Sequence, residues 1–451
     1  MPPGAVNPTP GSSRSFGRIF NLRPFAEDSP QLQEALLEIG KPGGMLDAND
    51  DLSRGPVDLI LDPALRVNNP DHPTHSAGIT FMGQFLDHDM TFDTTSTLGQ
   101  ATDPRSTRNQ RTPTFDLDSV YGNGPLVSRE LYDSVDGIKL KLETGGRFED
   151  LPRGADNVAI VGDPRNDENL VVCGIHLAMM SFHNQVVDRV RGEVPAGTDA
   201  MEVFHRARRQ VTWHYQWLIL HEFLPLFVGQ SLVDDILARG RRYFTTRSPF
   251  MPIEFQGAAY RFGHSMVRPS YRANQGGGGA PAFFGMVFDP SQMGNPDPDD
   301  LSGRCRAPRR FIGWETFFDF DDGEVRRNKL IDTTLSTPLF HLPSSTIARP
   351  PGADVGPTSL AQRNLLRHIT WSLPSGQALA RQMGMASLSP GDLEDLSGFG
   401  LGLESSSPLW FYVLREAEVM AAGRQPENVG GRIAVAVMLG LLQSDRASHL
   451  S

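Results

Sequence analysis

Apolar side chains recur at helical spacing along several long segments of this chain. In residues 168–190 they fall close to one helical turn apart, at Leu170, Cys173, Leu177, Met180 and Val187. Residues 201–224 carry a second long helical pattern, which we expect to end at Pro225 because proline interrupts the hydrogen-bond ladder. Shorter helices are expected over residues 31–39, 126–135, 359–384, 408–422 and 430–443, the last with a broad apolar face.

The segments between these helices are polar and contain most of the 35 prolines and 45 glycines. Loops are expected over residues 41–76 and 94–110, and a small hairpin over residues 138–148 around Gly145-Gly146. The glycine run within residues 275–283 is not followed by the Gly-Lys-Ser/Thr of a phosphate-binding loop. We therefore interpret that run as a flexible turn.

Strand patterns are few and short, and no repeat or linker cleanly divides the chain. These features predict a mainly α fold: one helical domain over residues 17–451, with long irregular loops and very little β structure. Residues 1–16 precede it and read as a flexible or loosely docked N-terminal arm, since they are rich in proline, glycine and serine.

Composition narrows the class of partner. The chain has 451 residues, 39% of them apolar and 21% charged, as in ordinary globular proteins. The net charge of −11 argues against nucleic acid or an anionic membrane as the main partner. Two cysteines, Cys173 and Cys305, cannot form a disulfide framework, and Cys173 is expected to be a buried small apolar residue. No signal peptide and no membrane-spanning apolar run are recognised, so a cytoplasmic location is expected.

The stretch FMGQFLDHDMTFD, residues 81–93, concentrates polar groups among phenylalanines. Read as a helix, it places Gln84 and His88 on one face with Asp87 beside them, while Asp89 lies about 100° further round. Burying a histidine and carboxylates on an apolar helix is costly unless they serve a purpose. The alternative interpretation is a solvated turn with a hydrogen-bonded histidine.

Two further segments carry unusual polar residues. In GDPRNDE, residues 162–168, Asp163 and Pro164 suit the start of the long helix, and Arg165 and Glu168 project from its first turns. We expect a third structured element over residues 251–266. It contains the motif YRFGH, whose last residue is His264. Taken alone, Arg165 and Glu168 could be a surface ion pair, and His264 a core histidine.

Taken together and in this order, QFLDHD, TPTFDLDSVYG, GDPRNDE and RFGH resemble the animal-type haem peroxidase family of the peroxidase–cyclooxygenase superfamily. The resemblance covers roughly residues 75–385. It implies a haem peroxidase fold, haem b as cofactor, and hydrogen peroxide with a small-molecule electron donor as reactants.

The resemblance also assigns roles to individual residues. It implies that His88 and Arg165 are the distal catalytic pair, with Gln84 beside them, and that His264 ligates the haem iron on the proximal side. Asp87 and Glu168 match the carboxylates that form ester bonds to haem. A Ca²⁺ site would be formed by Asp89, Thr112, Thr114, Asp116 and Asp118.

Elementary chemistry agrees with these roles. Cleaving a peroxide bond requires a base that takes one proton and returns it to the departing oxygen, which an imidazole such as His88 can do. A fixed guanidinium such as Arg165 stabilises the developing negative charge. Hard cations such as Ca²⁺ take several oxygen ligands, and an ion bound by Asp89 would fix the helix that carries His88. The alternative for TPTFDLDS is a simple turn with local hydrogen bonds.

Some residues depart from the family pattern. Asn169 follows Glu168 where one mammalian peroxidase has a haem-linked methionine. Arg261 stands three residues before His264, where fatty-acid oxygenases of the superfamily carry a tyrosine, and Tyr260 is one place too early. Asn364 is a candidate partner for the proximal histidine.

The leading hypothesis is therefore a peroxidase that oxidises small organic donors or halides. A haem-dependent oxygenase of fatty acids or another small substrate is the alternative. The third hypothesis is a helical binding protein without enzymatic activity.

Overall fold

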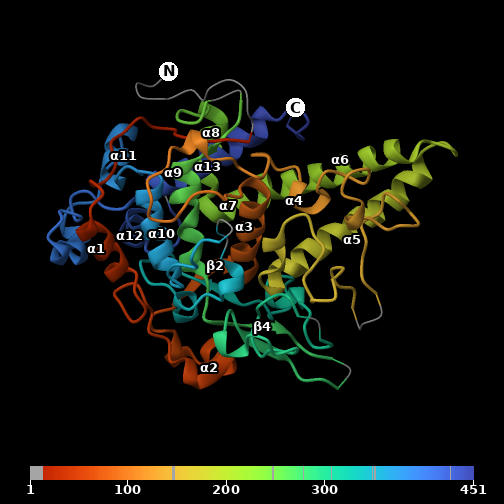
Figure 1. The fold of residues 1–451 in the computed structure, drawn as a ribbon, viewed down its shortest axis with the longest axis horizontal. Coiled ribbons are helices and arrows are strands. Elements are labelled where there is room, and N and C mark those ends of the chain that lie inside the picture. Colours follow the sequence, from red (N-terminus) through yellow and green to blue (C-terminus); the bar gives the residue numbers. More distant parts are fainter. Residues whose placement is uncertain are drawn as a thin grey trace.

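The computed structural model describes residues 14–144, 148–245, 248–277, 279–305, 307–347, 349, 352–426 and 428–450. Helices dominate these residues (Figure 1). The α-helices are α1 Pro30–Ile39, α2 Gly55–Leu61, α3 Ala77–Met90, α4 Asp118–Tyr121, α5 Leu170–Glu193, α6 Ala200–Leu218, α7 Leu224–Val228, α8 Gln230–Arg239, α9 Ile253–Gly257, α10 Leu360–Thr370, α11 Gly376–Met383, α12 Leu409–Ala421 and α13 Val429–Ser444. The predicted mainly α fold is confirmed.

Strands form only two-stranded pairs in the described part of the chain. β1 (Phe16–Gly17) pairs parallel with β3 (Met251–Pro252). Antiparallel pairs join β2 (Asp71–Ser76) to β6 (Arg327–Lys329), and β4 (Ser270–Asn274) to β5 (Phe283–Met286). Residues 1–13 of the predicted N-terminal arm lie outside the described residues, and Phe16 is buried where it pairs.

The helix α3 occupies the middle of the molecule, and α5 and α6 run side by side toward one edge (Figure 1). Most of α3 is buried, including Phe81, Phe85 and Leu86, because it contacts α5 and the 3-10 helix Ala259–Met266. α12 and α13 also contact that 3-10 helix and contribute a nearly continuous run of buried apolar side chains. The segments that carry the predicted polar residues therefore meet inside one core.

Several boundaries differ from the sequence prediction. Asp163 caps a separate 3-10 helix, Pro164–Asp167, whereas α5 starts after Asn169, whose side chain accepts from the Val172 amide at 3.0 Å. Pro225 does not end the second long helix: α6 continues through a π-helical turn, Ile219–Phe223, into α7. Pro225 stands in the first turn of α7, directly after the π-helical turn.

Other differences concern short elements. The predicted loop over residues 41–76 contains α2 and β2, and the predicted helix over residues 126–135 is reduced to the 3-10 turn Arg129–Leu131. The tip of the predicted hairpin at Gly145-Gly146 lies outside the described residues, although Glu143 and Asp150 pair beside it. The segment 359–384 divides into α10 and α11.

One described helix, α5, is long and apolar enough by length and composition to cross a membrane. In its most apolar 18-residue window, 56% of the residues are buried inside the protein, as in a core helix. The expectation of no membrane span remains a prediction.

Candidate active site

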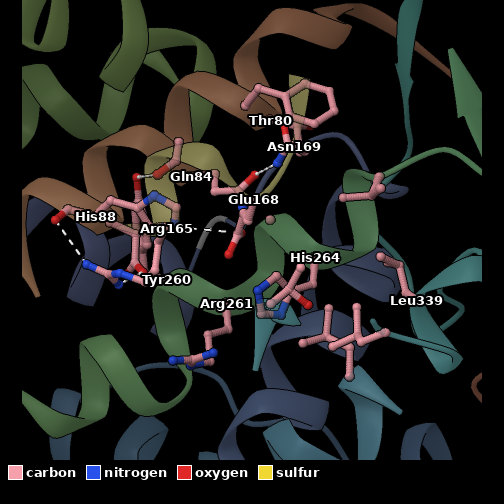
Figure 2. A pocket seen from close by; sticks show the side chains of 18 of the residues that line it. Thr80, Gln84, His88, Arg165, Glu168, Asn169, Tyr260, Arg261, His264 and Leu339 are labelled. Atoms are coloured by element: carbon pink, nitrogen blue, oxygen red, sulfur yellow. Dashed lines mark hydrogen bonds and ion pairs between the residues drawn. The ribbon is translucent and has the colours of Figure 1, made fainter. Parts of the chain in front are cut away.

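One pocket brings together the predicted residues from all three distant segments. Gln84, Asp87 and His88 line it from α3, Arg165 and Glu168 from the turn before α5, and His264 from the 3-10 helix Ala259–Met266. In Figure 2, His264 and Arg261 lie below the group formed by Gln84, His88, Arg165 and Glu168. The two histidines therefore border the same space.

His88 is held in one tautomer by an amide that the sequence analysis did not identify. Its Nδ1 lies 2.9 Å from the Asn166 side-chain oxygen, which can only accept, so Nδ1 carries the hydrogen. The Asn166 amide nitrogen in turn donates to Nδ1 of His176 at 2.8 Å. Nε2 of His88 is therefore left as a proton acceptor, 3.8 Å from a carboxylate oxygen of Glu168.

Burial keeps this imidazole neutral. Desolvation, with a smaller contribution from the nearby Arg165 guanidinium, lowers the pKa of His88 to about 3. A neutral imidazole with an unprotonated Nε2 can accept a proton from a bound molecule. The signals for the supporting residues were weak: Asn166 is hidden in the GDPRNDE motif, and His176 lies among apolar residues of α5.

Arg165 is fixed by several partners. Its Nε and Nη2 donate to the two carboxylate oxygens of Asp163 at 3.1 and 2.8 Å, and Nη2 also donates to the carbonyls of His88 and Thr91. The guanidinium carbon lies 4.2 Å from the ring centre of Phe92. Burial opposes charging of the guanidinium, but Asp163 outweighs it and raises the pKa of Arg165. The positive charge is thus held rigidly at the pocket wall.

Glu168 and Asp87 add carboxyl groups to the same wall. Gln84 donates its amide hydrogen to Glu168, and Asn169 donates to the Gln84 oxygen at 3.0 Å. Burial raises the pKa of Glu168 to about 8, against the opposing effect of Arg165, and burial also raises the pKa of Asp87. Both groups carry a proton more readily than ordinary carboxyls.

His264 is also oriented by an amide. The side-chain nitrogen of Asn364, on α10, lies 2.8 Å from its Nδ1. Burial, helped by the charges of Arg261 and Arg367, lowers the pKa of His264 to about 3, so the ring is neutral. A neutral imidazole beside a pocket can ligate a metal through Nε2 once the ring hydrogen is carried by Nδ1. This contact supports the prediction that Asn364 is the hydrogen-bond partner of His264.

Three arginines from two elements border the same pocket: Arg261, Arg363 and Arg367. Burial and the neighbouring Arg367 lower the pKa of Arg261 to about 9, and burial lowers that of Arg363 to about 10. Nε of Arg367 is buried without a hydrogen-bond partner. Such a concentration of buried positive charge is suited to an anionic ligand. The sequence analysis had noted Arg261 only as a departure and had missed the other two.

These features fit haem, which has an iron, an apolar ring and carboxylate groups. His264 offers a neutral nitrogen for the iron, the arginines offer partners for the carboxylates, and apolar side chains line much of the remaining wall, including Phe81, Val267, Val287, Phe288 and Leu339. The opposite wall holds His88 and Arg165.

A second cluster lies on the other side of α3. One carboxylate oxygen from each of Asp89, Asp116 and Asp118 lies within 4.8 Å of the others. Asp89 accepts from the Leu117 amide and the Ser119 hydroxyl, both at 3.1 Å. Burial and the neighbouring Asp118 raise the pKa of Asp116 to about 6, and burial with the two neighbouring aspartates raises the pKa of Asp89.

The predicted threonines lie in the same loop. The amide and hydroxyl of Thr112 donate to Asp118 at 3.1 and 3.4 Å, and the buried hydroxyl of Thr114 has no hydrogen-bond partner. Charge compensation comes from Arg111 and Arg14, 3.4 and 4.0 Å from Asp118, and from Arg208, 3.9 Å from Asp116. Three carboxylates and an unpaired hydroxyl fit a hard cation such as Ca²⁺.

A mainly helical fold in which the buried His88 and the half-buried His264 border one pocket is suited to holding haem. The family model for animal haem peroxidase matches residues 94–293, a range that contains Arg165, Glu168 and His264 and leaves His88 just outside. Residues 94–293 of the chain thus match the animal haem peroxidase family, and the resemblance seen in the motifs is confirmed.

Curated relatives match parts of the chain. Human thyroid peroxidase is 25% identical over 191 residues, which are 38% of this chain and 20% of that protein. Heme peroxidase 2 of Caenorhabditis elegans is 25% identical over 180 residues, 36% of this chain and 25% of that protein. The dual oxidase of Drosophila melanogaster is 30% identical over 121 residues, 27% of this chain and 8% of that protein. The matches thus span a quarter or less of each of these relatives.

Solved structures share the fold over most of the chain. Peroxidase A from Dictyostelium discoideum superposes with a TM-score of 0.58 at 16% identity, covering 96% of this chain and 88% of that one. A fatty acid alpha-dioxygenase from Arabidopsis thaliana gives a TM-score of 0.58 at 14% identity, covering 84% and 67%. The fold is therefore common to peroxidases and oxygenases.

Proposed function

We propose that this protein is a haem-dependent peroxidase that reduces hydrogen peroxide and oxidises small organic donors or halides. The observation that carries the proposal is a single pocket bordered by His88 and Arg165 on one wall and His264 on another. The matched family and the relatives named peroxidase support the same activity.

The chain's own residues supply the proton chemistry. Nε2 of His88, free because Nδ1 donates to Asn166, takes a proton from one peroxide oxygen and delivers it to the other, which leaves as water. The Arg165 guanidinium, held by Asp163, stabilises negative charge on the departing oxygen. Gln84 borders the same space and can hold a bound water or peroxide by its amide. Bound haem would supply the two electrons and later recover them from the donor.

Haem binding would rest on His264 as iron ligand, with Asn364 behind it. We also propose ester bonds from Asp87 and Glu168 to the haem, since both carboxyls line the pocket and burial raises the pKa of each. Acidic butanone extracts unlinked haem, so retention of haem in the protein after turnover with peroxide is the expected result. Complete extraction from the wild type after turnover would contradict the ester bonds but not the peroxidase activity.

Ca²⁺ is the second proposed cofactor, bound by Asp89, Asp116 and Asp118 with Thr112 and Thr114. Support comes from three clustered carboxylates and the unpaired Thr114 hydroxyl. Because Asp89 follows His88 directly on α3, a bound ion would hold the end of the helix that positions the catalytic imidazole.

An oxygenase is the second candidate, because the fatty acid alpha-dioxygenases share the fold. The tyrosine nearest His264 in the pocket, Tyr260, donates its hydroxyl hydrogen to the carbonyl of Gly83 at 2.9 Å. That hydroxyl is therefore already engaged, which favours the peroxidase. Oxygen uptake with a fatty acid and no consumption of peroxide would favour the oxygenase.

The decisive experiment is an absorption spectrum of the purified protein supplemented with haem, before and after adding peroxide, followed by a panel of phenols, aromatic amines and halides. We expect a Soret band that His264→Ala abolishes, a spectral change with peroxide, and donor oxidation. No Soret band in the wild type would instead favour a helical binding protein without haem.

A further inference from the structure

A second large cleft lies apart from the pocket described above and shares none of its residues. It has a volume of about 760 Å³, within the range typical of small-molecule sites. One face of α5 forms one side of it, through Leu170, Cys173, Gly174, Leu177, Ala178 and Ser181. The segment 307–315 and the residues around Phe148 and Phe320 form the remainder.

Aromatic rings gather in this cleft. Phe148 and Phe311 lie with ring centres 4.2 Å apart, and Trp314 lies against α5 at Gly174. A side-chain carbon at Gly174 would approach the Trp314 indole at 3.2 Å, so the absence of one lets the indole rest on the helix. Phe320 remains 62% exposed and Phe148 44% exposed, which is unusual for large apolar residues that serve only packing.

Carboxylates accompany the rings. Glu149, Asp150, Glu315 and Asp322 line the cleft, and the described lining contains one guanidinium, that of Arg310. The Arg310 side chain is buried and donates to the carbonyls of Pro298 and Asp300 at 2.6 and 2.7 Å, so its charge is directed into the protein.

Among these carboxylates only Asp150 has an arginine partner in the described part of the chain, Arg153 at 3.3 Å. Within the described lining, the carboxylates of Glu149, Glu315 and Asp322 therefore lie beside aromatic rings without an arginine partner. Aromatic rings attract organic cations through the ring quadrupole, most strongly at tryptophan. Nearby carboxylates attract the same cations by their negative charge.

We propose that this cleft binds a small aromatic compound that carries a positive charge, of the arylalkylammonium class. Its ring would insert among Phe148, Phe311 and Trp314, and its ammonium group would lie toward Glu149 and Glu315. The proposal does not depend on haem or on peroxidase activity.

Three phenylethyl probes whose head groups differ in charge test the proposal: cationic phenethyltrimethylammonium, neutral 2-phenylethanol and anionic 3-phenylpropionate. Isothermal titration calorimetry on the protein with and without haem measures their affinities. We expect the cation to bind about tenfold more tightly than the neutral probe and the anion to bind weakest. Equal affinities, no binding of the cation, or loss of cation binding when haem occupies the first pocket would overturn the proposal.

Variants locate the binding. The double variant Glu149→Gln, Glu315→Gln should reduce the advantage of the cation over the neutral probe to about threefold or less, and leave the neutral probe unchanged. Phe320→Ala, at an exposed position, should weaken the binding of both the cationic and the neutral probe. Glu394→Gln, which removes an exposed carboxylate elsewhere, is the matched control and should change neither affinity. A cation affinity that the double variant leaves unchanged would refute the assignment.

Discussion

The side-chain amide of Asn364 lies 2.8 Å from Nδ1 of His264, although the two residues are 100 positions apart. The amide oxygen of Asn364 lies 3.4 Å from Nη1 of Arg261, which donates to it. With its nitrogen at Nδ1 and its oxygen at Arg261, the amide places the ring hydrogen on Nε2, so ligation of iron through Nε2 requires the hydrogen to move to Nδ1 and the amide to make a half-turn that gives up the Arg261 contact. In either position Asn364 orients the ring so that Nε2 faces the pocket, which is what an iron ligand requires.

Removing this contact should weaken haem binding. We expect Asn364→Leu to lower the affinity for haem by about 10- to 100-fold, because partners behind a ligating histidine contribute that much to metal affinity. Titration of the haem-free protein with haem, followed at the Soret band, measures the change. Asn364→Asp places an acceptor facing Nδ1, which favours the tautomer with a free Nε2, and should retain more of the affinity than Asn364→Leu. Identical affinities of the wild type and the leucine variant would show that the contact is only structural.

The distal pair predicts a kinetic effect. We expect His88→Ala and Arg165→Ala each to slow the reaction of the haem-loaded protein with peroxide by about 10²-fold or more, because one removes the base and the other the stabilising charge. Stopped-flow absorbance measures the rate.

His205→Ala, on the exposed face of α6, is the control and should react as the wild type does. Arg165→Lys keeps a positive charge beside the buried Asp163 and separates loss of catalysis from loss of folding. Wild-type rates in both alanine variants would remove His88 and Arg165 from the mechanism.

The sequence was most informative where periodicity and motif order agreed. The long helix after Glu168 followed from the spacing of apolar residues, and of the two readings of residues 81–93 the structure shows the helix, with Gln84 and His88 on it. The order of four motifs indicated the haem peroxidase family. Because those motifs are local, they named residues on three segments, and the fold brings these segments to one pocket.

What sequence reasoning missed depends on long-range contacts. Asn166 and His176 support His88 through a chain of hydrogen bonds, and Arg363 and Arg367 come from a helix about 270 to 290 positions after α3. No local pattern distinguishes them from surface or core residues. The continuation of the helix through Pro225 was missed for a related reason: burial of Leu224 and Phe227 stabilises the element beyond a residue that usually ends one.

The aspartate cluster predicts that Ca²⁺ stabilises the protein. Burial and mutual repulsion raise the pKa of Asp89 and bring that of Asp116 to about 6, so a cation should relieve repulsion and displace protons on binding. At a Ca²⁺ concentration 100 times the dissociation constant, the gain in stability is about 2.7 kcal/mol.

Thermal unfolding with Ca²⁺ and with a chelator measures this gain. Asp118→Asn should reduce it, whereas Asp188→Asn, at an exposed site on α5, should not. An unfolding temperature that is independent of Ca²⁺ in the wild type would argue against the site.

Glu168 predicts a pH dependence in the haem-free protein. Burial raises its folded pKa to about 8 from an ordinary value of 4.5, so between these values the native state holds a proton that the unfolded state has released. Its contribution is complete below pH 4.5 and is lost as the pH rises through about 8. Glu168→Gln keeps an acceptor for the Gln84 amide but cannot ionise. We therefore expect the wild type to lose stability relative to this variant, by on the order of 2–4 kcal/mol, between pH 5 and 9. Urea unfolding of both proteins at pH 5, 7 and 9 measures the difference, in which the other titrating groups cancel. Parallel pH profiles would show that Glu168 is already ionised in the folded haem-free protein.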